Sequence, residues 1–156
     1  MKKLFYSFCL LLLAISTNAQ TPTISMTTTL SVGSQISFSI RGSSASTPIQ
    51  IDWGNGVKEN FTIGTSDEAF GFPTKGSTIK IWGQGVAGFN IQSKELTAME
   101  LFEAISLKTL FCKNNKITTL NLTCCSALTF VECKQNLINS LTLPSTTTLT
   151  YVDCSD

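Results

Sequence analysis

A 21-residue period runs through the second half of the chain, and it constrains the fold more than any other feature of the sequence. Cys112, Cys133 and Cys154 fall in register, and the apolar residues around them recur at the same offset. One period further back, the matching positions are all apolar: Val86, Phe89, Ile91, Leu96, Met99 and Leu101. A unit this short cannot bury its apolar face alone, so successive units must stack. The period therefore predicts a solenoid over residues 85–156, with three full-length units, the first of them atypical, and a fourth cut short.

The residues within each unit predict a short strand followed by a turn. Leu110 and Cys112 alternate along the strand and should point into the core, while strands of successive units pair in parallel about 4.8 Å apart. Asn115 and Asn136 follow their strands, at points where no sheet ladder satisfies the backbone. We expect their side chains to bond these backbone groups.

The pattern Leu-x-x-Leu-x-Cys-x-x-Asn-x-Ile-x-x-Leu-x-Leu resembles a leucine-rich repeat. It is similar to the cysteine-containing, 21-residue repeats of bacterial surface proteins, which occur in secreted proteins of the Bacteroidetes type and in internalin-like adhesins. The resemblance covers residues 86–156. It implies a curved solenoid that binds other macromolecules.

Three of the cysteines belong to the repeat, and their positions predict a ladder of buried thiols rather than disulfides. Cys112, Cys133 and Cys154 occupy a position that Ile91 fills in the first unit, and free cysteine packs as a small apolar side chain. Parallel stacking also points their Cβ atoms the same way, which suits a disulfide poorly. The redox state of Cys124–Cys125, outside the ladder, stays open.

Residues 1–19 have the three parts of a secretory signal peptide. Lys2 and Lys3 form a basic start, residues 4–15 are mostly apolar, and small or polar residues lead to a cleavage site after Ala19. The apolar run is too short to span a bilayer. We therefore expect a secreted or cell-surface protein with no membrane insertion after cleavage.

Residues 20–84 predict a small antiparallel β domain, because apolar and polar side chains alternate along them. Ile36, Phe38 and Ile40 share one face of a strand, and similar alternation occurs at residues 24–32, 49–53, 57–63 and 79–81. Residues 42–47 and 65–76 are expected to be the longer loops. The predicted fold is thus mainly β: a small antiparallel β domain followed by a short leucine-rich repeat solenoid with a parallel sheet.

The segment Asp52-Trp53-Gly54-Asn55-Gly56 predicts a hairpin, because Asn and Gly tolerate positive φ. It resembles the Asp-Trp-Gly-Asp-Gly turn of many bacterial surface β-sandwich modules, with Asn55 in place of the second aspartate. Asp52 and Asn55 could be calcium ligands, but a hard cation takes about six or more oxygens and this segment offers two such side chains. The favoured interpretation is that they bond their own backbone.

The composition argues against several kinds of function. The chain has no histidine, which rules out a Ser-His-Asp triad, a Cys-His pair and a histidine-ligated metal. Its net charge of +1 argues against an electrostatic nucleic-acid binder. No glycosidase-like motif pairs the available carboxylates, which are Asp52, Glu100, Glu103 and Glu132. We therefore expect a protein that is not an enzyme and has no metal site and no cofactor.

Strand residues that alternate with the core should lie on the concave face of the solenoid. The candidate ligand-binding residues on this face are Phe111, Lys113, Phe130, Glu132, Lys134, Tyr151 and Asp153. Exposed aromatic side chains are enriched at interfaces, although the same rings could serve to stabilise neighbouring strands. The expected function is an exported recognition module that binds a protein or glycan.

Three alternatives remain open at this point. The chain could be a structural spacer, or the N-terminal fragment of a larger cell-surface protein whose activity lies elsewhere. It could also associate with itself, because the last unit stops early and leaves the C-terminal end of the solenoid open.

Overall fold

The computed structural model describes residues 20–155, so the predicted signal peptide lies outside the described residues. No helix within this part of the chain has the length and apolar character needed to span a membrane. The strands are β1 (Ile24–Thr28), β2 (Gln35–Gly42), β3 (Thr47–Asp52), β4 (Glu59–Ile63), β5 (Glu68–Pro73), β6 (Thr78–Trp82), β7 (Val86–Asn90), β8 (Leu96–Leu101), β9 (Thr109–Phe111), β10 (Thr119–Asn121), β11 (Phe130–Glu132), β12 (Ser140–Thr142) and β13 (Tyr151–Asp153).

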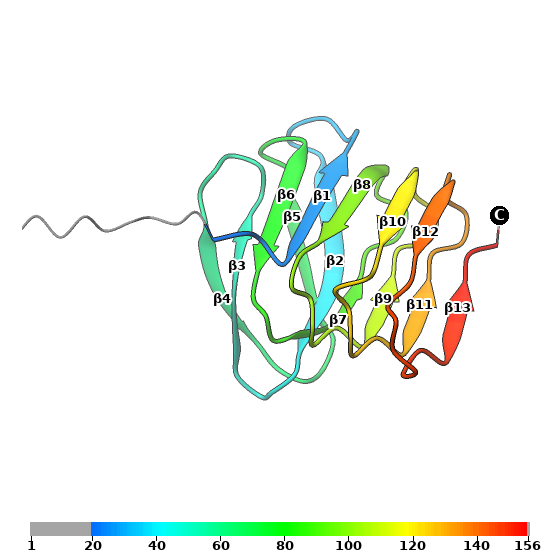
Figure 1. Ribbon diagram of the computed structural model, residues 1–156. Coiled ribbons are helices and arrows are strands. Elements are labelled where there is room, and N and C mark those ends of the chain that lie inside the picture. The colour runs from blue at the N-terminus through cyan, green and yellow to red at the C-terminus, as the bar shows by residue number, and fades with distance from the viewer. Residues whose placement is uncertain (1–19, 156) are drawn as a thin grey trace, which may run out of the picture.

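Two sheets form the layers of the molecule and enclose one hydrophobic core (Figure 1). Sheet A is antiparallel, with the order β4-β3-β6-β1-β8, and sheet B has the order β13-β11-β9-β7-β2-β5. Strands β10 and β12 form a short parallel pair that continues beyond β8 (Figure 1). The predicted fold class is confirmed, because an antiparallel β unit leads into a solenoid with a parallel sheet.

Each 21-residue unit forms one rung of the solenoid, and equivalent residues pair across successive rungs. Thr109 pairs with Gly88 on one side and with Phe130 on the other, and Phe130 pairs with Tyr151. The first three rungs contribute β7 and β8, β9 and β10, and β11 and β12, and β13 begins the fourth. The repeat arrangement predicted from the period is therefore present.

The N-terminal strands cover the first rung of the solenoid. Strand β7 pairs antiparallel with β2 and in parallel with β9, so sheet B continues from one part of the chain into the other. In sheet A, β8 pairs antiparallel with β1. Apolar side chains of both parts share a single buried cluster. The N-terminal unit thus supplies the cap that the first rung needs on that side.

The prediction of a loop at residues 65–76 is wrong, because strand β5 lies within this range. Phe70 and Phe72 alternate along β5 and pack against core aromatic rings. The intervening Gly71 and the terminal Pro73 concealed this strand in the sequence. Both residues suit an edge strand, and β5 lies at the edge of sheet B.

Two of the other strands are shorter than their alternation suggested. Strand β1 ends at Thr28 and β4 begins at Glu59. Val32 and Val57, which continued the apolar pattern, lie outside these strands and are exposed. The alternation of apolar and polar residues therefore predicted where these strands lie, but not the residues at which they begin and end.

Asp52 organises the turn between β3 and β4. Its Oδ1 atom accepts hydrogen bonds from the backbone N–H groups of Gly54, Asn55 and Gly56, at 2.8–3.0 Å. The Asn55 Oδ1 atom accepts a further bond from the Val57 N–H at 3.2 Å. Both side chains bond their own backbone, in agreement with the favoured interpretation of this segment.

The cysteine ladder differs from its prediction at two positions. A disulfide joins Cys133 and Cys154, whose Cα atoms are 4.9 Å apart. The spacing between rungs falls within the range that a disulfide spans, so parallel stacking does not exclude the bond. Cys112 is a fully buried free thiol, as expected, and Cys124 and Cys125 are also free.

Differential alkylation is expected to separate these cysteines into two groups. After denaturation without reductant, Cys112, Cys124 and Cys125 should be labelled, whereas Cys133 and Cys154 should not. In the native protein Cys112 should react very slowly, because burial raises the pKa of its thiol to about 12 and disfavours the reactive thiolate. Peptide mass spectrometry reads the labels. A Cys133→Ser variant is the control, since it should expose Cys154 to labelling, and labelling of Cys133 in the non-reduced wild type would contradict the disulfide.

Candidate functional site

A row of neighbouring aromatic rings lies on the outer face of sheet B. Phe111 (β9), Phe130 (β11) and Tyr151 (β13) project from this face, and we call them the aromatic row. The ring centroids of Phe111 and Phe130 are 5.0 Å apart, and those of Phe130 and Tyr151 are 4.3 Å apart with an interplanar angle of 8°. The structure thus brings the three predicted aromatic residues together. Phe111 and Phe130 are half-buried, and Tyr151 is exposed.

Stacking determines which part of each ring can meet a ligand. One face of Phe130 is stacked on Tyr151, and the Phe111 ring lies 5.0 Å away with a tilt of 35°, so the two neighbouring rings reduce the accessible surface of Phe130. Tyr151, at the end of the row, has one face that no other ring of the row covers. Aromatic edges carry the partial positive charge of the ring and the faces carry the negative charge. The row therefore presents an apolar strip of edges along the sheet, with a free ring face at its end.

The four charged residues of the predicted site form an alternating network, which we call the charge row (Lys113, Glu132, Lys134 and Asp153). The Lys134 Nζ atom lies 3.0 Å from Glu132 Oε1 and 3.2 Å from Asp153 Oδ2. The Lys113 Nζ atom lies 3.5 Å from Glu132 Oε1. The lysine side chains of these pairs are about one third exposed and the carboxylates less so. Ion pairs at a protein surface each contribute roughly 0–1 kcal/mol to stability. Their larger effect is to hold two positive and two negative groups at fixed places on the face.

Hydrogen bonds favour the charged forms of two members of this network, Asp153 and Lys134. The Ser155 hydroxyl and N–H donate to Asp153 Oδ1 at 2.8 and 3.2 Å, and together with Lys134 they lower the pKa of Asp153. Bonds to Glu132 and Asp153 raise the pKa of Lys134. Both groups therefore remain ionised through the neutral range.

A Lys134→Met variant is expected to raise the pKa of Asp153 toward its ordinary value. The rise should be partial, because the Ser155 bonds are the larger cause of the depression and remain in place. A depressed carboxyl pKa gives stability that is present above the unfolded pKa and lost as pH falls through the folded pKa. The variant should therefore lose less stability on acidification than the wild type. NMR titration of the Asp153 carboxyl carbon measures the shift, and Lys75→Met, which breaks a pair with Glu59 elsewhere, should leave Asp153 unchanged.

Arg41 extends the site beyond the repeats and was missed in the sequence. It lies opposite Gly88 in the pairing of β2 with β7, and a Cβ atom on Gly88 would fall 2.7 Å from the Arg41 guanidinium carbon. The Arg41 side chain thus occupies the space that larger residues fill in later rungs. Its Nη2 atom donates to Thr109 Oγ1 at 2.7 Å, and its Nη1 atom donates to Asp67 at 3.1 Å. The signal in the sequence was the glycine at this repeat position.

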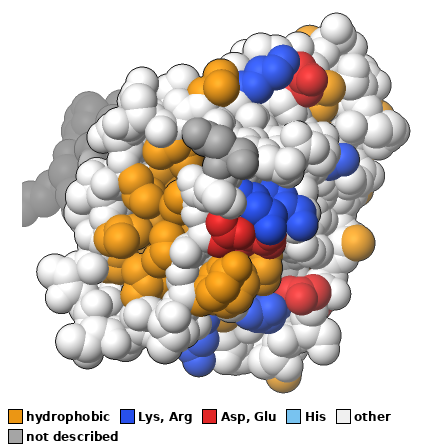
Figure 2. Space-filling model, turned by 90° about the vertical axis from the view of Figure 1, so that its right-hand side faces the viewer, with side chains coloured by type: hydrophobic (Ala, Val, Ile, Leu, Met, Phe, Trp, Pro, Cys, Tyr) orange, Lys and Arg blue, Asp and Glu red, His pale blue; other side chains and the backbone are white. Residues whose placement is uncertain are grey.

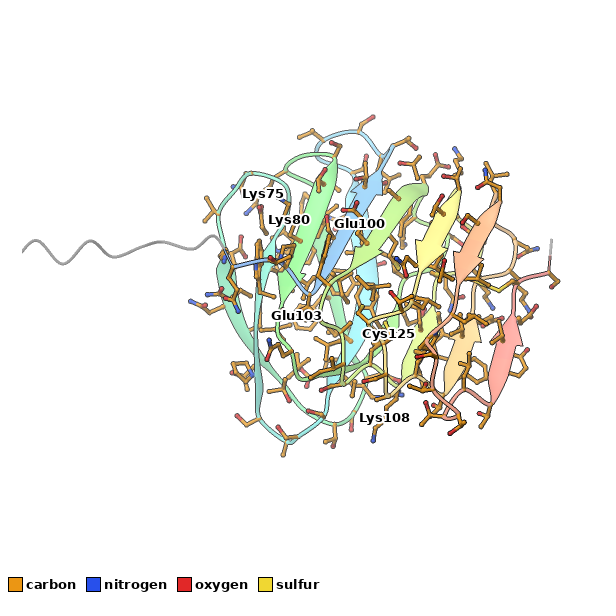
Figure 3. All side chains as sticks on the ribbon, in the orientation of Figure 1. Lys75, Lys80, Glu100, Glu103, Lys108 and Cys125 are labelled. Carbon is orange, nitrogen blue, oxygen red and sulfur yellow. A yellow bond between two sulfur atoms is a disulfide. The ribbon has the colours of Figure 1, made fainter. Side chains whose placement is uncertain are left out.

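The carboxylates that were considered as catalytic groups do not converge. Glu132 belongs to the charge row and Asp52 holds a turn. Glu100 lies on β8 in sheet A, and Glu103 follows that strand and accepts a bond from Gln84 at 3.1 Å (Figure 3). Within residues 20–155, no group of three or more Cys, Asp or Glu side chains is placed to hold a metal ion.

A hollow of about 860 Å³ lies over sheet A and is lined by uncharged side chains. Its Trp82 offers little free surface, because the Lys58 Nζ atom lies 4.0 Å above the ring and the indole N–H donates to the Gln20 carbonyl at 2.6 Å. Phe61, the other aromatic residue of the lining, is half-buried and packs against Phe70 and Phe72. The outer face of sheet B is therefore the stronger candidate.

Comparisons of the chain with protein-family models, with curated proteins and with solved structures find no match. The candidate site accordingly rests on its geometry: the aromatic row, the charge row and Arg41, on one face of one sheet.

Proposed function

We propose that the chain is a non-catalytic, exported recognition module that binds a partner protein through the outer face of sheet B. The observation that carries this proposal is the aromatic row beside the charge row. Aromatic side chains at the centre of a surface with ordered charges around them are typical of protein interfaces. Secretion or cell-surface display follows from the signal peptide expected at residues 1–19.

The repeats are proposed to be of the leucine-rich type found in bacterial surface proteins. The 21-residue rungs, the short parallel strands and the buried asparagines after β9 and β11 support this assignment. Proteins with such repeats commonly bind other macromolecules.

The stacking favours a protein over a glycan as the ligand. Sugars pack on the faces of aromatic rings, and in Phe130 one face is stacked on Tyr151 while the tilted Phe111 ring lies 5.0 Å from its centroid. An apolar strip of ring edges with fixed charges of both signs suits the side chains of another protein. A structural spacer remains the second candidate, because stacked rings also stabilise adjacent strands.

Binding assays on two arrays distinguish these functions. The probes are an array of extracellular proteins from the producing cell and an array of neutral and acidic oligosaccharides. The wild type should bind the protein array, and Phe130→Ala should weaken that binding by at least about tenfold. Phe102→Ala is the matched control, because Phe102 is an exposed aromatic residue that follows β8 of sheet A.

Each other outcome contradicts the proposal in a defined way. Equal binding by Phe130→Ala and the wild type, with both folded by near-ultraviolet circular dichroism, would place the contact elsewhere. Binding confined to oligosaccharides would make the ligand a glycan. Binding to neither array would favour the spacer.

A further inference from the structure

The hollow over sheet A lies at β3, β4 and the end of β6, on the side of the molecule away from β13 (Figure 1). Its volume of about 860 Å³ is within the range of pockets that hold small ligands. None of the described residues that line it is charged, and its polar side chains are amides and hydroxyls. The C-terminal end of the solenoid differs, because apolar side chains there border basic and acidic groups (Figure 2). An ionised ligand would lose water in the hollow without gaining an opposite charge, so the lining favours an uncharged ligand.

Two amide side chains in the hollow are held together and leave one donor and one acceptor free. Asn60, Gln50 and Trp82 form a row across β4, β3 and β6, because Gln50 pairs with both of the others. The Gln50 Nε2 atom donates to Asn60 Oδ1 at 2.9 Å, whereas Gln50 Oε1 and Asn60 Nδ2 have no hydrogen-bond partner among the described residues. A hydroxyl group both donates and accepts. Two adjacent hydroxyl groups of a sugar therefore fit this pair, one donating to Oε1 and the other accepting from Nδ2.

Trp82 gives the hollow an aromatic wall that one exposed lysine covers. The indole N–H donates to the Gln20 carbonyl at 2.6 Å, which fixes the ring. The Lys58 Nζ atom lies 4.0 Å from the ring centroid, and with Lys58 in this place Trp82 is 8% exposed. Cation–π contacts at exposed sites are weak, so a ligand can displace this side chain. Displacement would open a face of the indole ring, and sugar rings pack on such faces.

We propose that the hollow binds a neutral oligosaccharide, with adjacent hydroxyl groups of the sugar on Gln50 and Asn60 and a sugar ring on Trp82 in the place of Lys58. The first three side chains lie in one row, so a short oligosaccharide laid across the strands reaches all of them. Lys58 competes with this ligand instead of holding it. The site is independent of the proposed function, because the hollow lies on sheet A and the proposed protein-binding face belongs to sheet B.

Fluorescence titration with neutral tetrasaccharides tests the proposal. The probes are maltotetraose, cellotetraose and laminaritetraose, with tetragalacturonic acid as their acidic counterpart. The emission reports on this site, because Trp53, the other of the two tryptophans, is fully buried. At least one neutral tetramer should give a saturable change of emission, and the acidic tetramer should bind at least about tenfold more weakly than that one.

Two variants of the hollow should change the affinity in opposite directions. Asn60→Ala should weaken binding by at least about tenfold, because it removes the donor beside Gln50. Lys58→Ala should strengthen binding by about two- to fivefold, because the competing side chain is gone. Asn139→Ala and Lys108→Ala are the matched controls, since both make the same chemical change at exposed positions of the solenoid and should leave the affinity unchanged.

Four results would overturn the proposal. One is the absence of binding by all three neutral tetramers, and another is tighter binding of the acidic tetramer. Unchanged affinity in Asn60→Ala, with the variant folded by near-ultraviolet circular dichroism, would place the sugar outside the hollow. Weaker binding by Lys58→Ala would show that this lysine holds the ligand. Phe130→Ala separates this inference from the proposed function, because it should bind the neutral sugars as the wild type does even where it loses a partner protein.

Discussion

Replacing Asn115 by alanine is expected to lower the free energy of unfolding by about 3–5 kcal/mol. This buried side chain accepts bonds from the N–H groups of Lys94 and Leu96, at 2.9 and 3.1 Å. It also donates to the carbonyls of Ile91 and Cys112, at 3.1 and 3.0 Å. Each buried backbone group left without a partner costs roughly 1–3 kcal/mol. Alanine leaves several of them unpaired between two rungs, so the loss should be among the largest for one substitution in this chain.

Urea denaturation followed by circular dichroism measures this loss. Asn139→Ala is the matched control, because Asn139 is exposed and its side chain has no hydrogen-bond partner among the described residues. Its effect should stay within about 0.5 kcal/mol. A loss below about 1 kcal/mol for Asn115→Ala would mean that water replaces the amide and that the asparagine does not hold the rungs together.

The repeat made most of the solenoid predictable. A strict offset fixes which residues stack, so the pairing of Thr109 with Phe130 and the burial of Cys112 followed from the sequence. The role of the asparagines was also predictable, because backbone groups at the end of each strand need partners. Local patterns were sufficient in these cases because each rung meets only its neighbours.

Features that depend on contacts between distant segments were not predictable. The place of β5 depends on its pairing with β2, and its glycine and proline obscured the alternation. The contact of Arg41 with Gly88 joins the N-terminal unit to the first rung, and the repeat register marks the glycine but not the arginine that packs on it. The disulfide was missed for another reason: the parallel direction of the Cβ atoms was taken to argue against it, although strands about 4.8 Å apart bring equivalent Cα atoms within the range that a disulfide spans.

The candidate site was predictable in composition but not in geometry. The offset placed Phe130 and Tyr151 in one column, and the structure pairs them. It could not place Phe111 against Phe130, because they belong to different columns and meet through side-chain conformation. That contact turns a set of exposed rings into a stack with accessible edges, and it is the reason for preferring a protein ligand.

Replacing Leu110 by alanine is expected to lower the free energy of unfolding by about 2–5 kcal/mol. Leu110 is fully buried between the strands of the first and third rungs, with Phe89 before it and Val131 after it. The substitution removes three carbons and leaves a cavity that the stacked strands on either side cannot readily close. The same denaturation experiment measures the loss.

Variants at Val131 and Val152, which occupy the position of Leu110 in the next two rungs, test how burial changes along the solenoid. Val131→Ala should cost about 2–3 kcal/mol, because the residue is fully buried and a rung follows it. Val152→Ala makes the same chemical change where the side chain is 40% exposed, and it should cost less than about 1 kcal/mol. The ratio of the two valine effects reports how well the end of the solenoid is covered in solution. Equal losses for Val131→Ala and Val152→Ala would show that Val152 is buried in solution.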